Sequence, residues 1–253
     1  MSQHNISTVA HLIAEPVRAV ILIALADNCA RSASALAEAA GVTAQTASSH
    51  LAKLLDGGLL KVESKGRHRY YRLAGPHVAR VLESLASVGP VTRAWRTTPN
   101  RSARELRFAR CCYDHLAGQI GVAVTRRMVE RNYLVQRDEY AFELTPGGQS
   151  WLKKLGVDAG EPFADQVVGH ANRCLDWTER QYHIAGALGA YLMKAFCSNG
   201  WMTRGRETRA VTVTPAGWKA LREHFGIDRN AELDAQGQAR LGTRHLAENR
   251  DIA

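Results

Sequence analysis

The stretch from Gly41 to Leu73 constrains the fold of this chain more than any other. Its first part, Gly41-Val-Thr-Ala-Gln-Thr-Ala-Ser-Ser-His-Leu-Ala-Lys-Leu-Leu-Asp-Gly-Gly-Leu-Leu60, predicts a turn, a threonine-capped helix over about 44–56 and a Gly-Gly stop. Its second part, Lys61-Val-Glu-Ser-Lys-Gly-Arg-His-Arg-Tyr-Tyr-Arg-Leu73, predicts a basic β-hairpin. A short polar helix followed by a charged ribbon indicates a winged helix-turn-helix.

Apolar residues at helical spacing predict further helices before and after this stretch. A short opening helix from about Ile6 and a second helix over Glu15–Ala26 come first, because proline is tolerated in the first turn of a helix. A third helix, Ala35–Ala40, is capped by Ser32 or Ser34, and a further helix covers about Gly75–Val88. Together they supply the helix–turn–helix unit that the wing requires.

The polar side chains of the 44–56 helix and of the hairpin are candidates for DNA contacts. Gln, Ser and Thr donate and accept hydrogen bonds, as the reading of base edges requires, and Lys and Arg neutralise phosphates. The candidates are Thr43, Gln45, Thr46, Ser48, Ser49, His50, Lys53, Lys65, Arg67 and Arg69.

The positive charge is concentrated in the N-terminal part of the chain. Residues 1–104 carry 13 Lys and Arg against 6 Asp and Glu, whereas the remainder carries 20 against 18. A basic half joined to a near-neutral half favours a polyanion as partner of the first half. At 253 residues the chain is long enough for two domains. We expect a mainly α fold with small β-wings, divided into a winged helix-turn-helix at 1–90, a linker at 91–104, a duplicated effector or dimerisation domain at 105–228 and a polar tail at 229–253.

Several of these motifs resemble the ArsR/SmtB family of winged-helix repressors. They are Glu15-Pro-Val-Arg18, Ser48-Ser-His-Leu51, Leu54, Gly58-Leu-Leu60 and Gly66-Arg-His-Arg-Tyr-Tyr-Arg-Leu73. The resemblance covers about residues 6–90. It implies a homodimer built on the N-terminal helix and the helix after the wing, and a repressor that an effector releases from operator DNA. It also places the recognition element at 43–50 and the wing at Lys65, Arg67 and Arg69.

The sequence departs from the family at its familiar metal sites. The segment Arg31-Ser-Ala-Ser-Ala-Leu-Ala-Glu38 contains no thiol, although many members bind metal there through a cysteine pair. The helix after the wing offers only His77 and Glu83, where other members use Asp and His pairs. We therefore expect any sensing site to lie elsewhere in the chain.

The C-terminal half contains a repeat with a spacing of about 68 residues. The segment His115–Asp158 aligns with His183–Asp228, and the two repeats span about 105–158 and 170–228. Each repeat predicts a helix, a short pair of strands and a closing helix. Thr145 and Thr214 are the expected N-caps of the closing helices, with a proline at the next position.

Cysteines and histidines of the two repeats are candidate metal ligands. Cys111 and His115 stand at i and i+4, so on a helix they share one face, and we expect Cys174 and His183 along one helix of the second repeat. Thiolates and imidazoles from two facing helices form a tetrahedral, Zn-like site or a softer thiolate-rich one. The candidates are Cys111, Cys112, His115, Cys174 and His183. Inert thiols beside a structural histidine pair, an organic-ligand pocket and a redox-active Cys111/Cys112 pair remain alternatives.

The sequence thus predicts a dimeric repressor that binds double-stranded operator DNA and responds to a metal or metalloid ion. The same repressor responding to an organic ligand or to thiol oxidation is the alternative. We find no nucleophile elbow, phosphate-cradling loop or His-Glu-x-x-His pattern, so we expect no enzyme. No secretory signal or membrane-length apolar run is apparent, and we expect a cytoplasmic protein without a membrane partner. A winged helix used only for protein docking is disfavoured by the intact basic wing.

Overall fold

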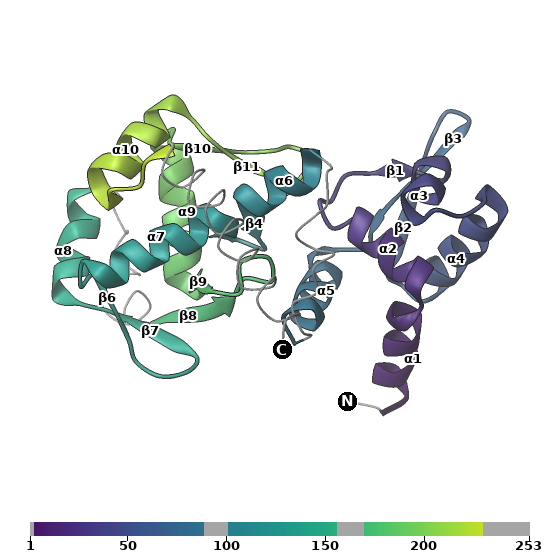
Figure 1. The fold of residues 1–253 in the computed structure, drawn as a ribbon, viewed down its shortest axis with the longest axis horizontal. Coiled ribbons are helices and arrows are strands. Elements are labelled where there is room, and N and C mark those ends of the chain that lie inside the picture. Colours follow the sequence, from purple (N-terminus) through teal and green to yellow (C-terminus); the bar gives the residue numbers. More distant parts are fainter. Residues whose placement is uncertain (1–2, 89–100, 156–169, 230–253) are drawn as a thin grey trace, which may run out of the picture. The chain divides into compact units, whose positions relative to one another are not determined.

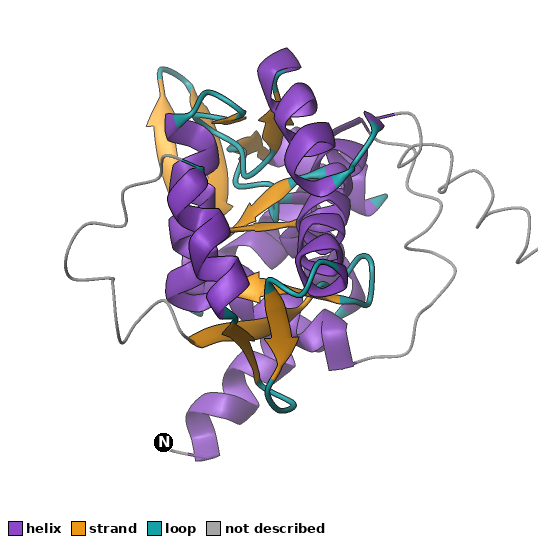
Figure 2. Cartoon of the chain, turned by 90° about the vertical axis from the view of Figure 1, so that its left-hand side faces the viewer, coloured by secondary structure: helices purple, strands orange, loops and turns teal. Residues whose placement is uncertain are grey.

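The structure is a computed structural model that describes residues 3–88, 101–155 and 170–229. Helices predominate and the strands are short (Figure 2). The chain forms two compact units. Unit 1 consists of 1–118, 175–181 and 204–211, and unit 2 consists of 119–174, 182–203 and 212–253. Most of the predicted tail and most of the predicted linker lie outside the described residues.

Unit 1 contains the predicted winged helix-turn-helix, with its elements labelled in Figure 1. The bounds of these elements are α1 (Gln3–Ala14), α2 (Pro16–Ala24), β1 (Arg31–Ser32), α3 (Ala33–Ala40), α4 (Ala44–Asp56), β2 (Leu60–Lys65), β3 (His68–Leu73) and α5 (Pro76–Val88). Unit 1 also contains α6 (Arg101–Phe108), β4 (Arg110–Cys112) and β5 (His115–Ala117).

Side-chain caps define where the helices of unit 1 begin. Ser32 accepts a hydrogen bond from the Ala35 amide at the start of α3, and Thr43 accepts one from the Thr46 amide at the start of α4. Between these helices Gly41 adopts φ 65°, a left-handed conformation that favours glycine and ends α3. The predicted turn between the two helices is confirmed.

The wing is an antiparallel hairpin that belongs to a three-stranded sheet of order β1-β3-β2. Its end pair is Lys65 opposite His68, so a two-residue loop connects the strands, and Gly66 in that loop has φ 62°. The core beneath the sheet and helices consists of buried aliphatic residues with one tyrosine. It contains Ile21, Leu22, Leu25, Leu36, Leu51, Leu54, Leu59, Leu60, Tyr71, Leu73, Val78 and Ala79.

Beyond the wing, unit 1 contains a second hairpin made of β4 and β5. Cys111 pairs with Leu116 and Cys112 with His115, and Tyr113 in the turn has φ 61°. The helix that we predicted through Cys111 and His115 is therefore wrong, because Tyr113 at left-handed φ reverses the chain between them. Helix α7 begins only at Gly118, whose φ of 78° separates it from the hairpin.

Unit 2 contains most of the elements of the predicted repeats. Their bounds are α7 (Gly118–Glu130), β6 (Leu134–Gln136), β7 (Ala141–Leu144), α8 (Pro146–Lys154), β8 (His170–Leu175), β9 (Tyr182–Ala185), α9 (Gly186–Ser198), β10 (Met202–Arg204), β11 (Val211–Val213) and α10 (Pro215–Phe225). One sheet has the order β6-β7-β8-β9, and β10 pairs with β11. The helix predicted through Cys174 and His183 is wrong, since the two residues lie on different strands.

The two repeats have matching element orders and matching helix starts. The Thr145 hydroxyl accepts a hydrogen bond from the Gly148 amide at 3.0 Å, and the Thr214 hydroxyl accepts one from Gly217 at 2.9 Å. Both threonines are followed by the first residue of a helix, a proline, as predicted. A common origin of the two segments stays a prediction.

Among the described helices, none alone is long and apolar enough to cross a membrane. Ile6–Ala14 and Pro16–Ala24, which are bent by 88° at their junction, together satisfy the test of length and composition.

Candidate nucleic-acid interface and metal centre

Helix α4 presents a polar face, as a recognition helix requires. Of the ten predicted DNA-contacting side chains, the nine other than His50 are exposed. The Thr43 and Thr46 hydroxyls lie 2.9 Å apart, and the Ser48 hydroxyl donates to the Ala44 carbonyl at 2.8 Å. The exposed amide of Gln45 extends from the same first turn of the helix. The N-terminal turns of α4 therefore display donors and acceptors suited to base edges.

His50 differs from the other candidates. It is half-buried, and its Nδ1 lies 3.2 Å from Oε2 of Glu15. Glu15 is also the N-cap of α2, where it accepts hydrogen bonds from two backbone amides. This contact connects the recognition helix to the start of α2, a structural role that the sequence analysis did not assign to His50.

The wing carries cations along its exposed edge. Lys65, Arg67 and Arg69 are exposed around the loop, and the Arg69 guanidinium lies 5.7 Å from the ring centre of Tyr71. Arg72 instead pairs with Glu63 on the opposite strand. Exposed lysine and arginine side chains of this kind can neutralise the phosphates of a nucleic acid.

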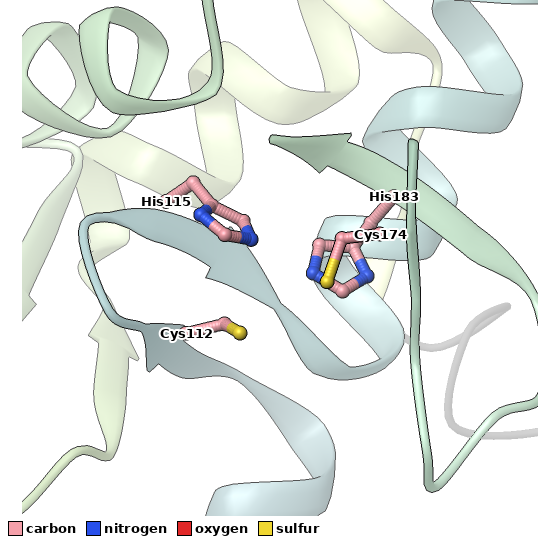
Figure 3. Close-up of side chains that lie close together, drawn as sticks. All are labelled: Cys112, His115, Cys174 and His183. Carbon is pink, nitrogen blue, oxygen red and sulfur yellow. The ribbon is translucent and has the colours of Figure 1, made fainter. Parts of the chain in front are cut away.

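Unit 1 also holds a buried cysteine–histidine pair on the β4–β5 hairpin. Cys112 and His115 face each other in the register, and their ligand atoms lie within 4.8 Å (Figure 3). His115 Nδ1 lies 3.0 Å from Asp114 Oδ1. Burial alone would lower the pKa of His115, but interactions with Cys112 and Asp114 outweigh burial and raise this pKa.

Unit 2 holds a second cysteine–histidine pair. Cys174 on β8 and His183 on the neighbouring strand β9 have ligand atoms within 4.8 Å of each other (Figure 3). Each pair thus offers one thiol sulfur and one imidazole nitrogen, the donors that Zn²⁺ takes in Cys₂His₂ sites. The donor chemistry of the two pairs fits a Zn-like ion.

A comparison with known proteins identifies the family. Residues 13–63 match a family model described as a helix-turn-helix domain. The uncharacterized HTH-type transcriptional regulator YdfF of Bacillus subtilis is 40% identical over 223 residues, which are 88% of this chain and 98% of YdfF. The chain belongs to the ArsR-type winged helix-turn-helix transcriptional regulators.

Two further relatives match a smaller part of this ArsR-type regulator. The HTH-type transcriptional regulator CmtR of Mycobacterium tuberculosis is 34% identical over 88 residues, which are 35% of this chain and 74% of CmtR. The winged helix-turn-helix domain of Mb0332 from Mycobacterium bovis, whose structure is described as homodimeric, is 35% identical. That match covers 34% of this chain and 78% of the Mb0332 fragment, with a TM-score of 0.32.

Cys111 of the regulator has surroundings different from those of Cys112. Successive side chains of a strand point to opposite faces, and the Cys111 sulfur donates to the Tyr113 carbonyl at 3.4 Å. Burial raises the pKa of the Cys111 thiol. The shared helix face that we predicted for Cys111 and His115 is wrong, and Cys112 is the cysteine that faces His115.

A buried polar cluster lies beside the hairpin and was missed as a site by the sequence analysis. The carboxylate of Glu83 on α5 accepts hydrogen bonds from Arg209 Nη2 at 2.6 Å and Trp177 Nε1 at 2.9 Å. Burial raises the pKa of Glu83, but Arg209 and Arg110 outweigh it and hold the pKa below its ordinary 4.5. Glu83 is the one acidic residue of α5, and this was the one available signal in the sequence. The distant partners of Glu83 left no local signal.

Proposed function

We propose that the chain is a dimeric repressor that binds operator DNA and is released by a Zn-like metal ion. The observation that carries the DNA-binding part is the joint display of a polar α4 and three exposed wing cations on one domain. The relatives that match it carry the names of transcriptional regulators, which favours a regulator over an enzyme. A cytoplasmic location stays a prediction.

An apolar exposed surface supports the dimer. Helix α5 exposes Val81 and Leu85 at 43% and 51%, and Val88 at 84%, while Ile6 of α1 is 56% exposed. These are the helix after the wing and the N-terminal helix, the two that the resemblance assigns to the interface. Burying such side chains against a second copy is favourable by about 25 cal/mol per Å² of apolar surface.

Both cysteine–histidine pairs are candidate metal ligands. Cys112 and His115 in unit 1 would supply one thiolate and one imidazole, and Cys174 and His183 in unit 2 would supply the same two kinds of donor, which are those of Cys₂His₂ zinc sites. Cys111 is left out of this set because it extends from the opposite face of β4. Its raised pKa keeps it a thiol and disfavours the alternative of a sensor based on Cys111 oxidation.

Titration of labelled duplex DNA from upstream of the chain's own gene tests the DNA-binding part. We expect Arg67→Ala to weaken binding to every sequence and to reduce the salt slope by about 1, whereas Gln45→Ala loses about 1–3 kcal/mol of discrimination at one base position. Lys219→Ala removes an exposed cation of α10 and serves as the control. Equal effects of Arg67→Ala and Lys219→Ala contradict the proposed interface.

Zinc binding by the full-length protein, purified under reducing conditions, tests the metal part. We expect one Zn²⁺ per chain by elemental analysis and weaker DNA binding when the ion is present. Cys112→Ser and His183→Asn each reduce the zinc content, whereas the matched controls Cys111→Ser and His77→Asn retain it. If the purified protein contains no zinc and its affinity for DNA does not change on addition of Zn(II) or Cd(II), the proposal of a metal-responsive repressor is excluded. The proposal of DNA binding is unaffected by that result.

A further inference from the structure

Glu83 connects helix α5 to three segments that are distant in the sequence, all within unit 1. Its Oε1 accepts hydrogen bonds from Arg209 and Trp177, and its Oε2 lies 3.4 Å from the sulfur of Cys112, which donates to it. The Arg110 Nε lies 3.5 Å from Oε1. A single carboxylate, 11% exposed, therefore contacts the hairpin that carries Cys112 and both loops that return to unit 1.

Arg209 extends this connection to the DNA-binding domain. Its backbone amide donates to the Asp27 carbonyl at 2.8 Å, and its Nη1 donates to the Ala26 carbonyl at 3.2 Å. Asp27 in turn binds Arg31 at 2.5 Å, and Arg31 pairs with Tyr71 of the wing strand β3. Hydrogen bonds thus run without interruption from the hairpin to the turn before the helix-turn-helix.

Arg209 also fixes the hairpin itself. Its Nε donates to the Cys111 carbonyl at 3.0 Å, and its own carbonyl accepts from the Cys111 amide at 2.8 Å. The hairpin, the 204–211 loop and α5 therefore share one buried polar network. Removing or moving one donor in such a network changes the geometry available to the remaining ones, because buried groups have no water to replace a lost partner.

We propose that Glu83 is the positioning residue through which the state of Cys112 reaches α5 and the turn before the helix-turn-helix. This inference rests on the proposed function, in which Cys112 binds a metal. An ion that binds the sulfur as a thiolate displaces the S–H proton, so Cys112 no longer donates to Oε2, and the Glu83 carboxylate then rearranges around Arg209. This rearrangement would shift both α5, which carries Glu83, and the Ala26–Asp27 turn, whose carbonyls accept hydrogen bonds from Arg209.

A double-mutant cycle on DNA affinity tests the inference without metal. We would measure the Kd of the full-length, chelator-treated protein for the labelled upstream duplex in wild type, Cys112→Ala, Glu83→Gln and the double variant. The expected result is that Cys112→Ala changes Kd about fivefold or more when Glu83 is present, the lower range of allosteric coupling, and less than about twofold in the Glu83→Gln background. The inference is overturned if the fold-changes in Kd of the two single variants simply multiply in the double variant. It is also overturned if Cys112→Ala leaves Kd unchanged.

Titration with Zn²⁺ alone separates this inference from the proposed function. We expect Glu83→Gln to bind zinc with wild-type stoichiometry. The Kd of this variant for the labelled duplex should change little or not at all when zinc is added. A full zinc response in Glu83→Gln overturns the inference and leaves the metal sensor standing. If wild type binds no zinc, the metal sensor fails and the double-mutant cycle still decides the inference.

Two further variants guard against misfolding and charge effects. Trp177→Phe removes the indole donor to Glu83 without changing any charge, and we expect it to weaken the dependence of Kd on Cys112 in the same direction. Glu130→Gln makes the same chemical change in an exposed pair with Arg127 on α7, and we expect it to leave that dependence at the wild-type value. A specific role for Glu83 is contradicted if Trp177→Phe leaves the dependence of Kd on Cys112 unchanged. It is also contradicted if Glu130→Gln alters that dependence.

Discussion

Arg110 is a deeply buried charge of unit 1, with 1% of its side chain exposed. Its Nη2 donates to Asp176 Oδ2 at 3.0 Å, and Asp176 is fully buried. The same carboxylate oxygen accepts from the Gly118 amide at 2.7 Å, at the junction between the hairpin and α7. Two charges removed from water are tolerated here because each is bonded to the other and to neighbouring groups.

Removing one charge of this pair is expected to destabilise the protein strongly. Asp176→Ala removes the carboxylate bonded to Arg110 Nη2 and leaves only Glu83, 3.5 Å from Nε, as counter-ion of the buried guanidinium. We expect a loss of about 3–5 kcal/mol in the free energy of unfolding, measured with urea. The double variant Arg110→Met and Asp176→Ala removes both charges and should lose less than Asp176→Ala alone. A double variant that is less stable than Asp176→Ala contradicts this account.

The lowered pKa of Glu83 predicts a pH dependence of stability. A carboxylate whose folded pKa lies below its unfolded value stabilises the fold above the unfolded value, about 4.5, and this contribution disappears as the pH falls through the folded pKa. We therefore expect the free energy of unfolding of wild type to exceed that of Glu83→Gln by about 2–3 kcal/mol at pH 7. This difference should shrink as the pH falls below about 4.5. Urea unfolding of the two metal-free proteins from pH 7 to pH 3 measures this difference. A difference that grows toward acid pH contradicts a lowered pKa of Glu83.

At the scale of the elements, the helix-turn-helix depends on local backbone signals. Gly41 ends α3 in the left-handed region, and Thr43 caps α4 two residues later. The space around Gly41 is open, because a Cβ there would meet no atom within 4 Å. Conformation alone, without steric contact, therefore decides which residue this turn accepts.

Substitution of Gly41 isolates this conformational cost. We expect Gly41→Ala to destabilise the protein by about 1 kcal/mol and Gly41→Asn by less, because asparagine tolerates the left-handed region better than alanine. Thermal or urea unfolding measures both. Gly58 also has a positive φ, 70°, and open surroundings, so Gly58→Ala is the matched comparison and should cost a similar amount. An Ala variant as stable as wild type contradicts the assigned conformation.

At the scale of the whole molecule, the exposed apolar side chains of α5 are unusual for a surface helix. Val81, Leu85 and Val88 are each more than 40% exposed, although Val78 and Ala79 in the first turn of α5 are buried in the core. An apolar stripe of this kind marks an interaction surface. We therefore expect the regulator to need its dimer for tight DNA binding, because two half-sites are then contacted together.

Acidic substitutions in this stripe test the dimer. We expect Val81→Asp with Leu85→Asp to shift the protein to a monomer in analytical ultracentrifugation and to weaken DNA binding at least tenfold, because like charges would meet across the interface. Val129→Asp changes an equally exposed valine of α7 and should leave the mass unchanged. A dimeric double variant would place the interface elsewhere.

The local signals of the chain determined the winged helix-turn-helix. Thr43, Gly41 and Gly66 act through their own backbone and nearest neighbours, so the caps, the turn and the wing were predictable from residue types and spacing alone. The exposure of nine predicted DNA-contacting side chains follows from the same periodicity. These features needed no knowledge of distant segments.

Tertiary structure alone decided the surroundings of the cysteines. The spacing of Cys111 and His115 suits a helix face equally well, and only the reversal at Tyr113 places Cys112 opposite His115 instead. The partners of Glu83 come from positions 94 and 126 residues away, and no local pattern announces Trp177 or Arg209. The sequence by itself determined the DNA-reading domain, because its interactions are local. Which thiol faces a histidine, and which carboxylate joins the hairpin to α5, depends on long-range packing that only the folded chain contains.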